Sequence, residues 1–234
     1  MSILQLLDST RDRVRTGWAA KLNVDSSVLV KPGITILTSE TAQGVLVLRL
    51  EQSWLVRRPE SVEAALAALS QNELIDMASL LRILEAYKPE PVGIASIAYA
   101  DLNTLRQAPS TYQVRAATAL DLNEVMSGCT DEENEESGLV TMPFLFSAHT
   151  TDGSVGAIAG YESWNDDLAQ LGVLAIPSQR GNGLAFAAAY ATTRAALDVD
   201  LIPQWRSRIG NEASSRMGER LGFQELGRQL FINL

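Results

Sequence analysis

The sequence is poor in the residues that build disulfides and metal centres. It has one cysteine, Cys129, and one histidine, His149, in 234 residues. A single cysteine excludes an internal disulfide, and without a cysteine cluster or a second histidine no zinc site is expected. Cys129 precedes an acidic run that raises a thiol pKa, so we expect an inert thiol in a reducing cytoplasm. His149 is expected to be a core or surface residue.

Long apolar runs and an excess of positive charge are also missing. No run of about 18 apolar residues occurs, so a membrane span is not expected. Arg11, Arg13 and Arg15 interrupt the N-terminal segment too early for a signal peptide. The formal net charge is −9, which argues against nucleic acid as a substrate or partner, because a nucleic-acid site needs a basic face. The composition indicates a globular cytoplasmic protein.

The most informative segment is a glycine-rich turn between an apolar strand and an alanine-rich helix. Residues 171–177 are apolar and end in proline, which predicts a buried strand. Residues 184–197 contain neither proline nor glycine and predict a helix. The turn 180–183 would expose backbone N–H groups at the positive end of the helix dipole, where a pyrophosphate can bind. Arg180 would add a charge-assisted contact.

Two other phosphate-binding signatures fit this turn less well. A P-loop requires Lys and then Ser or Thr after its last glycine, whereas Leu184 and Ala185 follow here. A dinucleotide-binding turn requires a third glycine, and Phe186 occupies that position. Asp198 and Asp200 lie at the distance at which that fold carries its acidic residue, so this alternative stays open.

The turn and the segments after it resemble the GNAT superfamily, the acyl-CoA-dependent N-acetyltransferases. That family has a strand ending near proline and then Arg/Gln-x-x-Gly-x-Gly/Ala at the start of a helix. A second strand, an asparagine, a short helix and a Gly-Phe pair follow. Here the loop is 180–185, the asparagine is Asn211, and the pair is Gly222-Phe223. The resemblance covers roughly residues 110–234.

The resemblance implies an α+β fold, with a mixed, mostly antiparallel twisted sheet flanked by helices. Residues 111–118 match the opening strand, and 144–149 with 154–161 match the central hairpin. We expect a GNAT acetyltransferase domain at 109–234. An additional N-terminal α/β portion at 1–108 is compatible with a degenerate GNAT-like half.

The N-terminal portion reads as short strands followed by helices. Its predicted strands are 28–30, 34–37, 44–50, 53–56 and 94–99, and its predicted helices are 60–69 and 73–87. No phosphate-binding loop occurs before residue 100, so we expect this portion to shape the acceptor pocket.

The resemblance also implies acetyl-CoA as the acyl donor. Backbone groups of the strand before the loop would pair with the pantetheine arm, and the loop amides would hold the pyrophosphate. The residues implied are Val173, Leu174, Ile176, Arg180, Gly181, Asn182, Gly183, Leu184, Ala185 and Asn211. The acceptor would be a primary amine that attacks the thioester directly.

The sequence departs from the family at both acid–base positions. The family's tyrosine, seven residues after the asparagine, is Gly218 here, and its common glutamate aligns with Gln170. Glu162 is the substitute base that we expect, and Tyr161 is a candidate acid. The expected function is therefore small-molecule N-acetyltransfer. The alternative is a non-catalytic acyl-CoA-binding module.

The acidic run at 131–136 lies between the expected first helix and the hairpin. We expect a solvated loop there. The other interpretation places the run on the acceptor side, where its charge would attract a cationic amine. The sequence leaves the oligomeric state open, a homodimer included.

Overall fold

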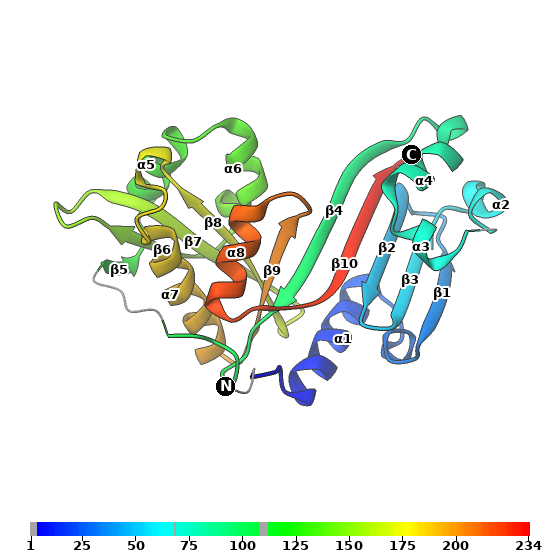
Figure 1. Cartoon of the computed structure of the whole chain (residues 1–234), viewed down its shortest axis with the longest axis horizontal. Helices are drawn as coiled ribbons and strands as arrows, with labels where there is room; N and C mark the ends of the chain where they lie inside the picture. Colours follow the sequence, from blue (N-terminus) through cyan, green and yellow to red (C-terminus); the bar gives the residue numbers. More distant parts are fainter. Residues whose placement is uncertain (1–3, 68, 108–111) are drawn as a thin grey trace. The chain divides into compact units, whose positions relative to one another are not determined.

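The computed structural model describes residues 4–67, 69–107 and 112–234 (Figure 1). The chain forms two compact units, each assembled from three segments. The first unit comprises 1–17, 99–205 and 216–224, and the second comprises 18–98, 206–215 and 225–234. The predicted boundary between residues 108 and 109 lies outside the described residues.

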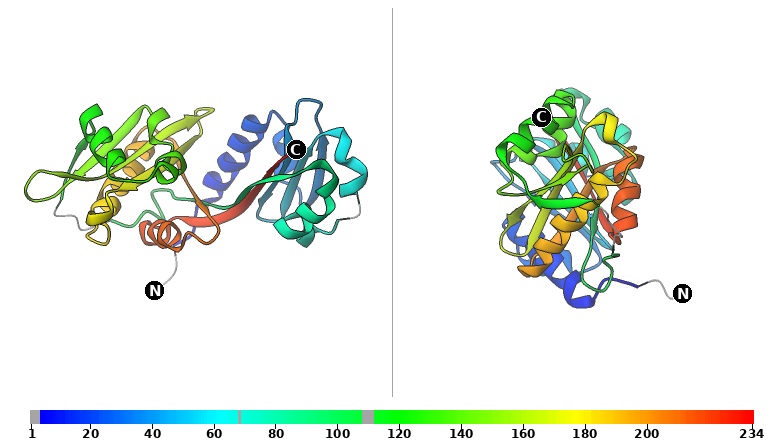
Figure 2. Two further views of the ribbon diagram at one scale, coloured as in Figure 1. Left: turned by 90° about the horizontal axis from the view of Figure 1, so that it is seen from above. Right: turned by 90° about the vertical axis from the view of Figure 1, so that its left-hand side faces the viewer.

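The first unit is a mostly antiparallel sheet with helices packed against it, as the α+β prediction requires. Its strands run in the order β9 (Ile202–Arg208, beginning in this unit), β8 (Leu168–Ala175), β7 (Val155–Trp164), β6 (Phe144–His149) and β5 (Gln113–Ala116). Only β8 and β9 pair in parallel. Its helices include α5 (Ala119–Ser127), α6 (Asp131–Ser137) and α7 (Leu184–Asp198). Helix α7 packs along β6, β7 and β8, which the turned views of Figure 2 also show.

The second unit has its own set of strands and its own core. Its strands are β1 (Gly33–Thr38), β3 (Ser53–Arg58), β2 (Gly44–Leu50), β10 (Gln224–Asn233) and β4 (Glu90–Tyr99), in that spatial order. Its helices are α2 (Glu63–Leu66), α3 (Gln71–Leu74) and α4 (Met77–Ile83). Leu66, Leu74 and Leu80 of these helices pack with Val47 and Leu230 of the sheet into one buried cluster. Helices α1 (Asp8–Leu22) and α8 (Glu212–Leu221) contribute residues to both units.

Three predictions for the second unit differ from the structure, one in kind and two in extent. The predicted strand 28–30 falls on a 3₁₀ turn, Ser26–Leu29, which begins where the Asp25 side chain accepts the Ser27 N–H. The predicted helix 73–87 is broken, because Asp76 accepts the Ser79 N–H and starts a new helix. The predicted helix 60–69 is only α2 and the 3₁₀ turn before it. In the segment 73–87, a side-chain cap thus divides one predicted helix into two.

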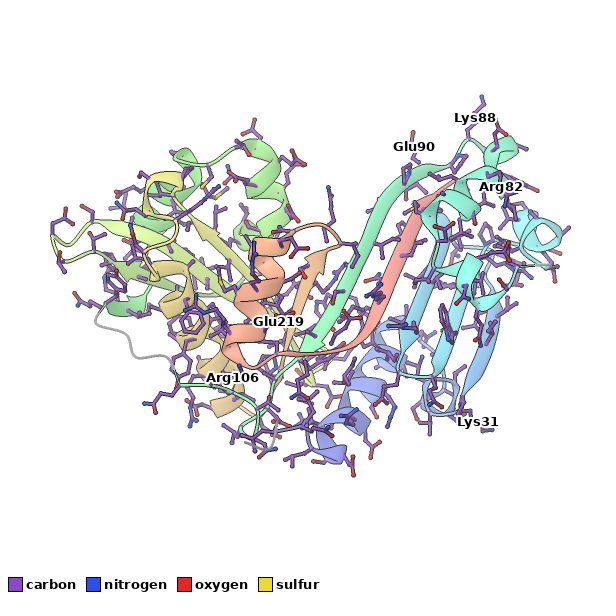
Figure 3. All side chains as sticks on the ribbon, viewed as in Figure 1. Lys31, Arg82, Lys88, Glu90, Arg106 and Glu219 are labelled. Atoms are coloured by element: carbon purple, nitrogen blue, oxygen red, sulfur yellow. The ribbon has the colours of Figure 1, made fainter. Side chains whose placement is uncertain are left out.

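The glycine of the Gly-Phe pair is required by a close approach of two backbones. Gly222 has φ +99°, and a Cβ there would collide with the carbonyl of Thr104. The Arg106 N–H donates to the carbonyl of Leu221 at 2.9 Å, so this segment lies against the end of α8. Figure 3 labels Arg106 near that end of the helix. Only glycine fits at position 222.

Candidate functional site

The glycine-rich turn ends β8 and opens α7 as predicted. Helix α7 begins at Leu184, and Gly183 is its N-cap with φ +89°. Gly181 has φ +81°, and no atom lies within 4 Å of a Cβ built there. The first backbone bond of α7 runs from the Ala187 N–H to the Gly183 carbonyl, so the earlier N–H groups have no acceptor within the helix. The turn therefore offers backbone donors at open space beside a helix N-terminus.

The sequence did not indicate three contacts that hold the turn. The Tyr112 hydroxyl donates to the Asn182 carbonyl at 2.6 Å. The Arg180 guanidinium donates through Nε to the Ala175 carbonyl at 3.2 Å and pairs through Nη2 with Glu133 at 2.7 Å. Arg180 is therefore held at the side of the turn, already paired with a carboxylate.

The acidic run is a helix, which corrects the expectation of a solvated loop. Residues 131–136 belong to α6, and the Thr130 side chain accepts the Glu133 N–H in a capping box. The Thr130 N–H and then Arg180 hold the pKa of Glu133 below its usual value. Burial, followed by the charge of Glu133, raises the pKa of the Cys129 thiol, which agrees with an inert cysteine.

The parallel pairing of β8 with β9 is short and ends just before the predicted binding strand. The paired residues are Leu168 with Ile202, Ala169 with Pro203, and Gln170 with Gln204. Beyond Gln170, β8 continues to Ala175 with β7 on one side. Among the described residues, no strand pairs with its other edge there.

The register of β7 and β8 decides which backbone groups face this open edge. The Ile176 N–H donates to the Gly156 carbonyl at 3.0 Å, and the Ile176 carbonyl accepts the Gln179 N–H at 2.8 Å. Backbone groups of an antiparallel strand alternate between its two edges, so Leu174 also faces β7 while Val173 faces the open edge. The backbone groups of Ile176 are therefore already bonded and those of Leu174 face β7, whereas Val173 faces the open edge; the contacts of all three with the pantetheine arm stay predictions.

A chain of side-chain amides lies at the point where the pairing of β8 and β9 ends. Gln170 donates through Nε2 to the Leu171 carbonyl at 2.9 Å. Gln204 donates through Nε2 to Gln170 Oε1 at 2.6 Å, and the Tyr99 hydroxyl donates to Gln204 Oε1 at 2.7 Å. Gln204 and Tyr99 have no exposed surface. Gln170, at the position of the family's glutamate, thus has both its side-chain nitrogen and its side-chain oxygen hydrogen-bonded within the protein.

The two predicted catalytic residues do not lie on the same side of the sheet. Glu162 is directly opposite Gln170, and one of its oxygens accepts the Trp164 Nε1–H at 2.9 Å. Tyr161 is the next residue along β7 and therefore points to the opposite face. Its ring stacks on Phe144 with centroids 4.7 Å apart, and burial raises its pKa. Tyr161 is thus packed against Phe144 on the face opposite Glu162, and its role as a candidate acid stays a prediction.

Two positions predicted from the family pattern lie in or next to helix α8: Gly218, where the family has a tyrosine, and Asn211. A Cβ at Gly218 would lie 3.1 Å from the Trp205 indole, which itself packs on Phe223. Gly218 therefore leaves room for Trp205. Asn211 belongs to the second unit, where its Oδ1 accepts the Ser214 N–H at 3.1 Å and caps α8.

His149 belongs to a buried polar cluster of β5, β6 and α5. Its Nε2 lies 3.0 Å from the Ser147 hydroxyl, and its Nδ1 lies 3.1 Å from the Gly153 carbonyl. Asp121 lies between them and Arg115, which pairs with it at 2.9 Å. Ser147 has no exposed surface, so this Ser-His-Asp group cannot meet a substrate. It joins β5, β6 and α5.

Neither a metal centre nor a membrane helix is visible in the described ranges. There, no three His, Cys, Asp or Glu side chains are grouped to hold a metal ion. None of the helices in these ranges combines the length and apolar character that crossing a bilayer demands.

Solved structures share this fold at low sequence identity. A Drosophila protein has a TM-score of 0.52 at 15% identity, with 99% of this chain and 91% of that chain covered. A functionally unknown conserved protein of Staphylococcus epidermidis has a TM-score of 0.51 at 12% identity, covering 68% and 69%. A GCN5-related N-acetyltransferase from Kribbella flavida gives 0.49 at 17% identity, covering 66% of this chain and 63% of that chain.

The expected α+β fold, a mostly antiparallel sheet flanked by helices, is confirmed, and these likenesses concern the fold alone. No protein-family model matches the sequence, and no curated protein matches it either.

Proposed function

We propose that this protein is an N-acetyltransferase that moves an acetyl group from acetyl-CoA to a primary amine of a small molecule. One observation carries the proposal. The open edge of β8 at Val173 leads directly into a turn, 181–183, whose N–H groups stand at the start of α7. An amide-bearing chain that ends in a diphosphate fits this sequence of groups, because a strand edge pairs amides and a helix N-terminus binds phosphate.

The residues divide into a cofactor side and a reaction side. Val173 pairs with the pantetheine amides through its N–H and carbonyl. Backbone N–H groups from Gly181 to Ala185 hold the diphosphate, and Arg180 adds positive charge beside them. Asn211 caps α8 in the second unit, and its contact with the cofactor stays a sequence-based prediction outside this proposal.

Glu162 is the proposed general base. The Trp164 indole fixes one carboxylate oxygen, and the other is left to accept a proton from the ammonium or from a relayed water. The neutral amine attacks the thioester carbonyl, the C–N bond forms, and the C–S bond breaks. The thiol of CoA needs no enzymatic acid, because a thiolate with a pKa of about 8.5 leaves readily near neutral pH. The missing tyrosine at Gly218 is compatible with this reaction.

The proposed acceptor is a small cationic amine, and the proposed compartment is the cytoplasm. Helix α6 exposes Asp131, Glu132, Glu135 and Glu136 beside β8. This negative charge favours the approach of a cation.

A second function is favoured by a specific observation. Gln170 is engaged in the amide chain and Gly218 lies under Trp205, so neither of the family's acid–base positions can act. A non-catalytic acyl-CoA-binding module would have these features.

Binding and turnover measured on the same preparation test the proposal. Titration calorimetry with CoA, acetyl-CoA and NAD is expected to give heat with the first two only. Thiol release from acetyl-CoA is then followed with a panel of polyamines, aminoglycosides and simple amines. Saturable binding without thiol release from any amine indicates the binding module. No heat with CoA, or heat with NAD instead, rejects both functions in favour of the dinucleotide alternative or another ligand.

A further inference from the structure

The amide chain beside the open edge of β8 has one possible direction. The Leu171 carbonyl can only accept, so Gln170 must turn its NH₂ group toward it. The Gln170 oxygen then faces Gln204, which must donate through its own NH₂ group. The remaining oxygen of Gln204 accepts the Tyr99 hydroxyl. The Leu171 carbonyl at one end therefore determines which atom donates and which accepts in each hydrogen bond of this amide chain.

A glutamate at position 170 would not fit this chain when ionised. A carboxylate has two acceptor oxygens and no donor, so one oxygen would face the Leu171 carbonyl without a proton between them. A buried acceptor left without a donor costs free energy. Glutamine and a protonated glutamic acid each offer a donor and an acceptor at once. The structure therefore favours glutamine over glutamate at this position for a structural reason.

We propose that Gln170 and Gln204 form an amide clamp that fixes the point where β8 and β9 stop pairing and so positions the thioester beside Glu162. This inference rests on the proposed acetyltransferase function. The clamp is built at the last paired residues of both strands, and Gln204 is completely buried. The clamp ties the Leu171 carbonyl to a side chain and leaves Val173, two residues on, as the edge group for the donor. Gln170 is a positioning residue, and the base is its neighbour across the strands.

Gln170→Glu tests the clamp, with Gln113→Glu as the matched control. Gln113 is an exposed strand residue at the start of β5. Gln113→Glu therefore adds the same charge to the protein without changing the amide chain. Two titratable groups of neighbouring strands face position 170: Glu162 on β7, and Tyr99 through Gln204. Missing donors, burial and the charge of Glu162 all raise the pKa of a glutamate placed there.

The first readout is the melting temperature at pH 5 and pH 8. A raised folded-state pKa gives stability that is present at low pH and lost as the pH rises through that pKa. Gln170→Glu should therefore melt about 4 °C or more below the wild type at pH 8 and close to it at pH 5. Gln113→Glu should stay near the wild type at both. A Gln170→Glu variant that melts like the control at both pH values overturns the clamp.

The second readout is catalytic and distinguishes the clamp from a vacant base site at position 170. The clamp predicts that Gln170→Glu lowers kcat about 10- to 100-fold at pH 8, with CoA affinity within about twofold, and recovers toward the wild type at lower pH. A rise in kcat would instead show that position 170 is a vacant base site, and it overturns the clamp. If the wild type releases no thiol with any amine, the proposed function fails, and the melting comparison alone decides the clamp.

Discussion

The side chain of Glu162 on β7 stands directly opposite that of Gln170 on β8. This relationship places the only carboxylate proposed for catalysis beside the last residue of β8 that pairs with β9. Glu162→Gln keeps the acceptor for the Trp164 indole but removes the base, so kcat/KM should fall about 10²- to 10⁴-fold. CoA affinity by calorimetry should not change. The matched control is Glu90→Gln, at the exposed start of β4 in the second unit, which Figure 3 labels. Equal activities of both variants would remove Glu162 from the mechanism.

Gly181 in the turn and Gly153 in the connection between β6 and β7 form a matched pair. Gly181 and Gly153 have φ of +81° and +90°, and neither has an atom within 4 Å of an added Cβ. Valine at either position introduces a similar backbone strain of about 1–2 kcal/mol. Only Gly181→Val should also weaken CoA binding, by about tenfold or more, because its side chain would occupy the space proposed for the diphosphate. Calorimetry and thermal melting of both variants separate the two effects. A normal CoA affinity in Gly181→Val contradicts the proposed phosphate site.

The ion pair between Arg180 and Glu133 predicts a gain in affinity. Glu133→Gln keeps the capping box of α6 and releases the guanidinium, so CoA affinity should rise about two- to fivefold at low salt. The gain should shrink as salt screens the charges. Glu136→Gln removes the same charge from the exposed part of α6 and should change affinity less. Equal gains in CoA affinity for the two variants would contradict the prediction, because a general charge effect would then explain both.

Restoring the family's tyrosine should not restore a catalytic acid. A side chain at position 218 would press on the Trp205 indole, and this overpacking should cost about 1–3 kcal/mol of unfolding free energy. Gly218→Tyr should therefore unfold at lower urea concentration, and Gly218→Ala should show part of the same loss. Thiol release by Gly218→Tyr should not exceed that of the wild type. An increased rate with unchanged stability would mean that α8 accepts the phenol.

Acid should weaken the first unit through Asp121. Burial by itself raises the pKa of this carboxyl, but the Thr118 N–H and hydroxyl and the Arg115 guanidinium outweigh it, and the pKa is lowered. A lowered folded-state pKa gives stability that is present above about pH 3.9 and lost as the pH falls through the folded value. Asp121→Asn should lose about 1.5–3 kcal/mol at pH 7 and less near pH 3.

Urea denaturation at both pH values checks the Asp121 prediction, and Asp76→Asn serves as its control. Asp76 also caps a helix and has a lowered pKa, but it is exposed, so its loss should be smaller. A loss in Asp121→Asn that is independent of pH would contradict the assignment to the charged form.

Much of the first unit could be predicted because its signals are local. The start of α7 at Leu184 follows from glycines that need positive φ and from an alanine-rich run after them. The hairpin of β6 and β7 follows from alternating apolar strands around a Asp-Gly turn. The acidic run was predicted to be a solvated loop because of its charge. Thr130 and Glu133 instead form a capping box that starts a helix.

The sequence by itself determined the position of the glycine turn, the strand before it and the helix after it, because each depends on residues close together in the chain. Only the tertiary structure decided which groups of that strand are free. The bond from Ile176 to Gly156 sets the phase of β8, and the chain from Leu171 through Gln170 and Gln204 to Tyr99 joins residues far apart in the sequence. Backbone direction and side-chain partners depend on strand register, which no local pattern specifies.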